Sequence, residues 1–175
     1  MTNYRGNFLY GFIACGPYEV LPEWVFDKVF CPPVETDPIT GESKVAQVGL
    51  RRVESALLQG YRRDEVFIAN PEMLEKSIGP DTKVVGINVM DPLGMAPVTT
   101  TMSPEKLSYV AMKFKKMCAN IIQLKKKYDF HVVVGGNGAW ELAKSDRMQI
   151  HGIDTVVVGE ADELALDLFH DLEKG

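Results

Sequence analysis

The chain has 175 residues, of which 46% are hydrophobic and 25% are charged, and its formal net charge is −5 at pH 7. This length and balance are typical of one folded domain with a sizeable core. The negative net charge argues against a nucleic-acid binder, which needs a concentrated basic surface. No apolar run in the sequence approaches the length of a transmembrane helix.

The three cysteines, Cys15, Cys31 and Cys118, lie far apart in the chain. Their spacing matches no zinc or iron–sulfur ligand set, so we expect no metal site in this chain. Unpaired cysteines favour a reducing, cytoplasmic compartment. The apolar run that follows Arg5 is short and has a single basic residue before it, so we expect no export signal.

We interpret residues 1–43 as an irregular N-terminal elaboration with a first strand and a loop. The apolar run Phe8 to Cys15 is the candidate strand, and residues 31–42 are dense in the Pro, Gly, Thr and Asp that mark loops. From residue 44 to residue 175 the pattern is regular. We therefore expect a single domain overall, with residues 44–175 forming its main fold.

The regular part begins with a helix in which Leu50, Leu57 and their neighbours recur at helical spacing. Asn70 and Pro71 have the pattern of a cap and a first helical residue. The expected elements in this part are a strand at 65–69, a helix at 71–77 and a strand at 83–90.

After a loop at 91–102, Ser103-Pro104 is predicted to begin the longest helix. Its apolar stripe runs from Leu107 to Leu124 and includes Cys118, which we interpret as a core residue. The remaining expected elements are a strand at 129–134, a helix at 140–147, a strand at 154–158 and a closing helix at 161–172.

Strands and helices alternate, and three of the strands are continuous apolar runs. Such strands are buried on both faces, which indicates a parallel sheet with helices on either side. The sequence therefore predicts a three-layer, doubly wound α/β domain with a mainly parallel sheet. In this architecture ligands bind beyond the carboxyl ends of the strands.

Two strand ends carry glycine: Gly135, Gly136 and Gly138 follow one strand, and Gly159 follows the next. Glycine lets the main chain approach a ligand closely, but it also serves a plain strand-to-helix turn, and each loop alone fits the turn. A phosphate-loop motif is absent from the sequence. Acidic residues at this edge, such as Asp91 and Glu160, are explained by capping as well as by catalysis, and no histidine joins a catalytic set.

The ordered succession VVGINVMD (Val84 to Asp91), VVVGGNGAW (Val132 to Trp140) and DTVVVGEADE (Asp154 to Glu163) resembles a known family. It is similar to the cobalamin-binding-type N-terminal domain of radical S-adenosylmethionine enzymes, over roughly residues 46–172. The segment before Lys44 resembles an archaeal-type elaboration of that domain.

The resemblance implies a flavodoxin-like, Rossmann-like fold whose strand-end loops hold a cofactor, with cobalamin as the candidate. On this basis the nucleotide tail of cobalamin would pack along one strand-end loop, and the last loop would complete the site. The implied cofactor-binding residues are Asn88, Asp91, Gly135, Gly136, Ala139, Gly159 and Glu160.

Two departures from the family matter. The D-x-H-x-x-G motif that supplies a lower cobalt ligand in some cobalamin proteins is absent, and so is the C-x-x-x-C-x-x-C motif of a radical S-adenosylmethionine cluster. We therefore expect no catalytic residues here. The resemblance implies an N-terminal domain of a longer iron–sulfur oxidoreductase, in which the cluster and S-adenosylmethionine belong to a downstream domain.

Two other interpretations stay open. The chain could be a docking domain that kept the fold and lost the cofactor, with Trp140 and the loop from Met90 to Met102 as the contact surface. It could also be a small nucleotide-binding enzyme of flavodoxin type, although it lacks a phosphate loop. The expected partners are a downstream radical S-adenosylmethionine domain and a small cofactor or substrate. We expect neither nucleic acid nor a membrane as a partner.

Overall fold

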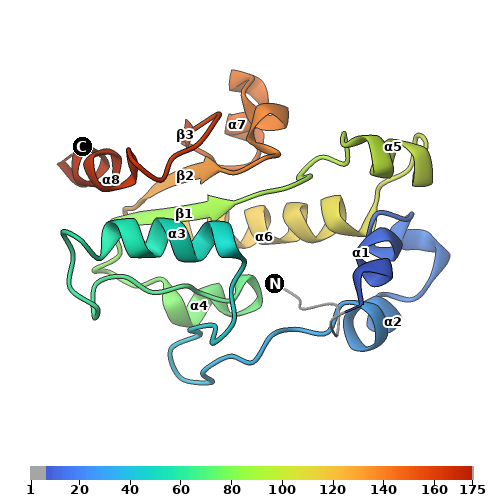
Figure 1. Ribbon diagram of the computed structural model, residues 1–175, viewed down its shortest axis with the longest axis horizontal. Helices are drawn as coiled ribbons and strands as arrows, with labels where there is room; N and C mark the ends of the chain where they lie inside the picture. The colour runs from blue at the N-terminus through green and yellow to red at the C-terminus, as the bar shows by residue number, and fades with distance from the viewer. Residues whose placement is uncertain (1–6, 175) are drawn as a thin grey trace.

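A computed structural model describes residues 7–174 and shows an α/β fold (Figure 1). The sheet is small, open and fully parallel, and Asn88 at the end of its first strand lies opposite Gly135. The α/β class and the parallel sheet are thus confirmed, whereas a flavodoxin-like strand order stays a prediction. In spatial order the strands are β1 (Val84–Asn88), β2 (His131–Gly135) and β3 (Thr155–Val156).

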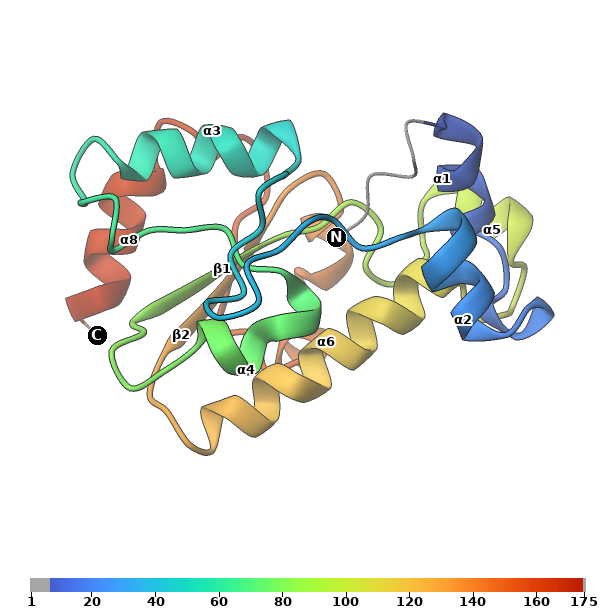
Figure 2. The same ribbon diagram turned by 90° about the horizontal axis from the view of Figure 1, so that it is seen from below.

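Helices cover both faces of the sheet, as a three-layer fold requires (Figure 2). Helices α4 (Leu74–Ser77) and α6 (Tyr109–Lys125) lie on one face, and α3 (Val48–Leu57) and α8 (Ala165–Lys174) on the other. A Cβ on Gly86 of β1 would lie 3.0 Å from the ring of Phe169. Glycine at this position therefore lets α8 pack directly onto the sheet.

The main core lies between the sheet and α6. Val132 and Val134 of β2 have no exposed surface, and Cys118 on α6 is 2% exposed, so its predicted core role is confirmed. Apolar residues one turn apart on α6 face the buried strand, which accounts for the stripe seen in the sequence. The other buried members of this core include Phe114, Ile121, Leu124, Leu142 and Ile153.

The predicted first strand at Phe8 to Cys15 is wrong, because the segment forms helix α1 (Phe8–Ala14). The Asn7 side chain accepts a hydrogen bond from the Leu9 N–H and so caps the helix. A short apolar run does not distinguish a buried strand from a helix. Three short elements follow: η2 (Tyr18–Val20), α2 (Glu23–Val25) and the π-helix η3 (Phe26–Phe30).

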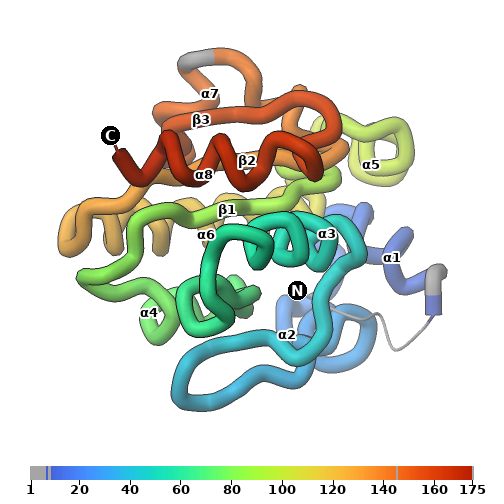
Figure 3. The backbone as a smooth tube through the Cα atoms, turned by 60° about the vertical axis from the view of Figure 1, so that its left-hand side comes forward, coloured from blue at the N-terminus to red at the C-terminus, as the bar shows by residue number. Residues whose placement is uncertain are grey.

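The connection from η3 to α3 contains isolated β-bridges but no helix or strand, in line with the predicted loop. Figure 3 shows it passing α4, where the Ser77 hydroxyl donates to the Thr40 carbonyl at 2.9 Å. The predicted strand at 65–69 is wrong. This segment pairs with the connection only through a single bridge between Glu42 and Ala69, instead of joining the sheet.

The predicted helix at 71–77 is confirmed as η4 (Pro71–Met73) followed by α4, and the Asn70 side chain accepts the Glu72 N–H. The predicted start of the longest helix at Ser103 is wrong. Ser108 caps it instead, and Glu105 interrupts the helical path with a φ of +59°.

Further boundaries differ from the sequence pattern. The predicted loop at 91–102 contains α5 (Pro97–Met102), and the predicted helix at 140–147 is divided into η5 (Ala139–Leu142) and α7 (Ser145–Ile150). Strand β3 is shorter than predicted, and α8 begins at Ala165. Within residues 7–174, no helix is long and apolar enough to span a membrane.

Candidate functional site

The carboxyl edge of the sheet gathers the loops that the sequence singled out, together with the start of α3 (Figure 1). The Asn88 side-chain amide donates to Gln47 Oε1 at 3.0 Å, just before α3 begins. A Cβ on Gly49 would lie 3.6 Å from the same amide nitrogen. The amino end of α3 therefore lies beside the end of β1, and Gln47 and Gly49 join the edge without having been predicted.

Two of the three clustered glycines contact the protein's own main chain. Gly136 has a φ of +100°, and a Cβ there would lie 2.6 Å from the Val89 carbonyl oxygen. A Cβ on Gly138 would lie 2.5 Å from the Met90 carbonyl carbon. The Gly138 N–H also donates to the Val89 carbonyl at 3.0 Å. These glycines let the loop after β2 pack against the loop after β1, which is a structural role.

Gly135 and Gly159 are different, because space remains beside them. The nearest atom to a Cβ on Gly135 would be the Val157 carbonyl oxygen at 3.9 Å, an ordinary contact distance. Gly159 has a φ of +113°, and a Cβ there would meet nothing within 4 Å. Adjacent strand ends thus present bare main chain at the edge.

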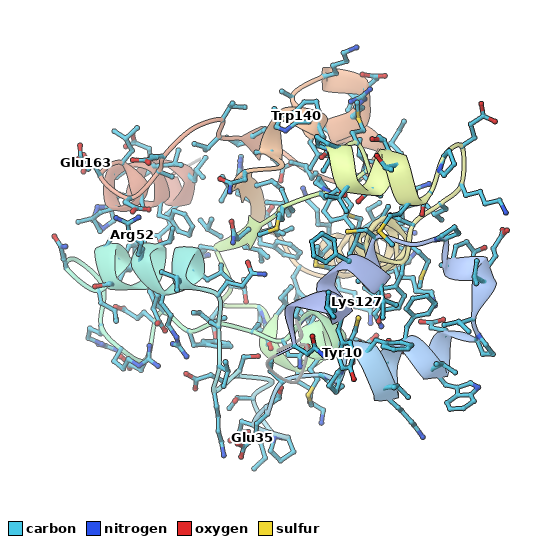
Figure 4. The ribbon with its side chains drawn as sticks, turned by 45° about the vertical axis from the view of Figure 1, so that its right-hand side comes forward. Tyr10, Glu35, Arg52, Lys127, Trp140 and Glu163 are labelled. Atoms are coloured by element: carbon cyan, nitrogen blue, oxygen red, sulfur yellow. The ribbon has the colours of Figure 1, made fainter. Side chains whose placement is uncertain are left out.

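The other two predicted residues on these loops have contrasting positions. Ala139 has no exposed surface and belongs to the core, whereas Glu160 is exposed. Arg52 of α3 pairs with Asp162 at 3.0 Å and ties α3 to the loop after β3. Figure 4 shows Arg52 near the segment that carries Glu163, and Trp140 at the top of the view.

Asp91 does not point to the open part of the edge. Its carboxylate accepts the Ala96 N–H at 2.9 Å and the Thr99 hydroxyl, so it organises the turn that leads into α5. The structure therefore brings Asn88, Gly135 and Gly159 to one surface, and it places Asp91 in a separate polar cluster behind it.

Sequence reasoning missed the second member of that cluster. Glu141 has no exposed surface, and its Oε2 accepts the Leu93 N–H at 2.8 Å. Burial raises the pKa of Glu141 to about 7; the N–H groups of Leu93 and Met95 oppose the rise, and the Asp91 carboxylate adds to it. The acidic residue in the short helix η5 carries no local signal of its own burial, because the loop that covers it, at Leu93, lies 48 residues earlier in the chain.

Two hollows lie elsewhere on the described surface. One, of about 560 Å³, is at the amino ends of the strands, where it mixes lysine and acidic side chains around His131. The other, of about 180 Å³, is apolar and lies beside Cys118 and Ile150. Neither includes a residue of the predicted site.

Two of the three cysteines within residues 7–174 are buried, and no metal-ligand cluster is found among these residues. No group of three His, Cys, Asp or Glu side chains there is arranged to hold a metal ion. Burial raises the pKa of both Cys31 and Cys118 to about 12, so these thiols stay protonated at neutral pH and are poor nucleophiles.

The fold and this edge define the class: an α/β protein with a small, open parallel sheet whose carboxyl edge exposes glycine main chain. Comparisons with protein-family models, with curated proteins and with solved structures give no match.

Proposed function

We propose that this chain is a binding domain of the cobalamin-binding type, which holds a cofactor or substrate at the carboxyl edge beside Asn88, Gly135 and Gly159. The observation that carries the proposal is the free space at two adjacent glycine strand ends. Ligands of parallel α/β sheets bind at this edge, and bare main chain permits a close approach.

The geometry limits how cobalamin would bind. A nucleotide tail inserted along Gly136 and Ala139 does not fit, because Gly136 is packed against Asn88 and Val89, and Ala139 is buried. The open space beside Gly135 and Gly159 supports a ligand laid over these strand ends instead. Asn88 lies opposite Gly135 in the sheet, so its side-chain amide is a polar group at this surface. When bound, cobalamin would supply methyl-transfer or redox chemistry at its cobalt.

The same resemblance extends the proposal to the whole protein. We place the fold among flavodoxin-like domains and assign the reaction to a radical S-adenosylmethionine domain with an iron–sulfur cluster that works together with this chain. The three cysteines described here are free, which supports a cytoplasmic protein.

Titration with hydroxocobalamin, followed by its visible spectrum, tests the proposal. We expect saturable binding to the wild type and at least tenfold weaker binding to Gly135→Val, whose added methyl groups fill the free space. Gly79→Ala is the matched control, because a Cβ there meets nothing within 4 Å and Gly79 precedes β1, away from the carboxyl end of that strand. Absence of any spectral change, or equal binding by Gly135→Val, would contradict cobalamin at this site.

Exposed apolar side chains favour a second candidate function, docking to a catalytic domain. Met90 is 68% exposed and Trp140 is 49% exposed, and they lie on the two loops that Gly138 packs together. If docking is the function, Trp140→Ser weakens association with the cluster-bearing domain and leaves the hydroxocobalamin titration unchanged. If ligand binding is the function, Gly135→Val weakens hydroxocobalamin binding and leaves association with the cluster-bearing domain unchanged.

A further inference from the structure

A buried carboxyl group with an unpartnered oxygen lies directly behind the carboxyl edge. Glu141 on η5 is 0% exposed, and although its Oε2 accepts the Leu93 N–H, its Oε1 has no hydrogen-bond donor. An unpaired buried polar atom is destabilising, so a native structure ordinarily provides it with a partner.

The group that faces this carboxyl is another acid. The Asp91 side chain interacts with the Glu141 carboxyl group. Both carboxylate oxygens of Asp91 already accept hydrogen bonds, one from the Ala96 N–H and one from the Thr99 hydroxyl. Two ionised carboxylates in contact repel each other, whereas one proton between them converts the contact into a hydrogen bond. A proton held on Glu141 would then let its unpartnered Oε1 donate a hydrogen bond to Asp91.

A basic side chain also lies next to the cluster. Arg147 of α7 donates to the backbone carbonyl of Glu141 at 2.5 Å and to Met95 Sδ at 3.4 Å, so it does not pair with the carboxyl itself. The remaining contacts of the two acids are main-chain N–H groups and the Thr99 hydroxyl. N–H groups directed at the acids also make the cluster a poor site for a metal cation.

We propose that Asp91 and Glu141 share one proton and form a latch that closes the β1–α5 loop onto the glycine loop, and that loss of this proton weakens the latch. Asp91 organises the loop from one side, and Glu141 holds Leu93 from the other. Both loops form the edge, because Val89 exchanges backbone hydrogen bonds with Gly135 and Gly138. The proton therefore controls how firmly this edge is assembled, whatever ligand it binds.

Amide hydrogen exchange at Leu93 tests the latch when wild type and Glu141→Gln are compared at the same pH. The glutamine amide donates to Asp91 at every pH, and its carbonyl still accepts from Leu93. We expect the ratio of the Leu93 exchange rates, wild type over variant, to rise by at least tenfold from pH 5 to pH 8. Comparing the two proteins at each pH cancels the intrinsic pH dependence of exchange.

Glu160→Gln is the matched control, because Glu160 is an exposed acid at the same edge, and its ratio to wild type should stay constant. A Leu93 ratio that is equal at pH 5 and pH 8 would overturn the proposal. The Glu141 carboxyl carbon, followed by NMR in the wild type, provides a second measurement that needs no variant. A midpoint near 7 supports the shared proton, and a midpoint near 4.5 overturns it.

Discussion

Gly136 was predicted to contact a cofactor, but in the structure it allows two loops of the protein to pack together. Its φ of +100° is unfavourable for any side chain, and a Cβ would lie 2.6 Å from the Val89 carbonyl oxygen, which belongs to rigid main chain. We therefore expect Gly136→Ala to lower the free energy of unfolding by about 3 kcal/mol, through clash and backbone strain together. Urea denaturation followed by circular dichroism measures this loss.

The neighbouring glycine is the matched control for that experiment. At Gly135 the nearest atom to an added Cβ would lie at 3.9 Å, so Gly135→Ala should change the free energy of unfolding by less than about 1 kcal/mol. Equal losses of unfolding free energy in Gly136→Ala and Gly135→Ala would contradict this prediction. They would show that the contact with Val89 does not determine the cost of an added methyl group.

Glu141 makes the stability of the protein depend on pH. Its pKa is about 7 in the folded chain and 4.5 for an ordinary glutamate, so folding favours the protonated acid. The unfolded chain releases this proton more readily, and stability therefore falls as pH rises from about 4.5 to about 7. The difference corresponds to roughly 3 kcal/mol.

Glu141→Gln removes this dependence because the amide does not ionise. We expect the variant and the wild type to have similar free energies of unfolding at pH 4.5, and the variant to be more stable at pH 8 by up to roughly 3 kcal/mol. Urea denaturation at the two pH values provides the comparison. A variant that is less stable than the wild type by the same amount at both would contradict the raised pKa.

Elements with local signals were predictable from the sequence, and elements defined by distant contacts were not. The stripe on α6, the helix after Gln47 and the Asn70 cap each depend on residues within a few turns, and all three are confirmed. Helix α1 shows the limit. Its apolar run fits a strand as well as a helix, and packing against the start of α6 decides between them.

The same distinction applies to the candidate site. The meeting of Asn88 and Gly135 follows from parallel strands, whose carboxyl ends share an edge, and the structure pairs these two residues. The covering of Gly136 by Val89 and of Glu141 by Leu93 depends on contacts between loops that are nearly 50 residues apart. No local pattern around either residue indicates that contact.

Helix α6 is tied to the N-terminal elements by Lys113. Its Nζ lies 3.0 Å from an Asp27 oxygen on η3 and 2.8 Å from a Glu72 oxygen on η4. Burial alone would lower the pKa of Lys113, but the hydrogen bonds with Glu72 and Asp27 outweigh it, and the pKa is raised. The half-buried ammonium group therefore joins three elements in its charged form.

We expect Lys113→Met to lower the free energy of unfolding by about 1–2 kcal/mol, because it leaves two carboxylates without their cation. Lys115→Met on the exposed side of the same helix should change it by less than about 0.5 kcal/mol. Urea denaturation at low and high salt checks the cause, since screening should reduce the Lys113 effect. Equal effects of both substitutions would argue against the ion pairs.

Residues 7–174 contain two clusters of buried side chains, and α6 contributes to both. Tyr109 and Met112 in its first turns pack with Phe26 and Ala14, whereas Phe114 and Cys118 belong to the main core. The rings of Phe26 and Tyr109 stack with their centroids 4.5 Å apart. Figure 2 shows α1 and α2 gathered around the amino end of α6, away from α8. Because α6 is one continuous helix that contributes side chains to both clusters, we expect the two clusters to unfold together.

This coupling predicts a single cooperative transition. Phe26 is 2% exposed, so Phe26→Ala should lower the free energy of unfolding by about 3–5 kcal/mol through the cavity it leaves. Trp24 lies on α2, two residues before Phe26, and Trp140 lies on η5 next to the core residue Ala139. The background variants Trp140→Phe and Trp24→Phe therefore isolate one fluorescent probe in each region. Both probes should shift to the same lower urea midpoint. An early transition of Trp24 alone would mean that the N-terminal elements unfold independently, and α6 would then not transmit stability between the two clusters.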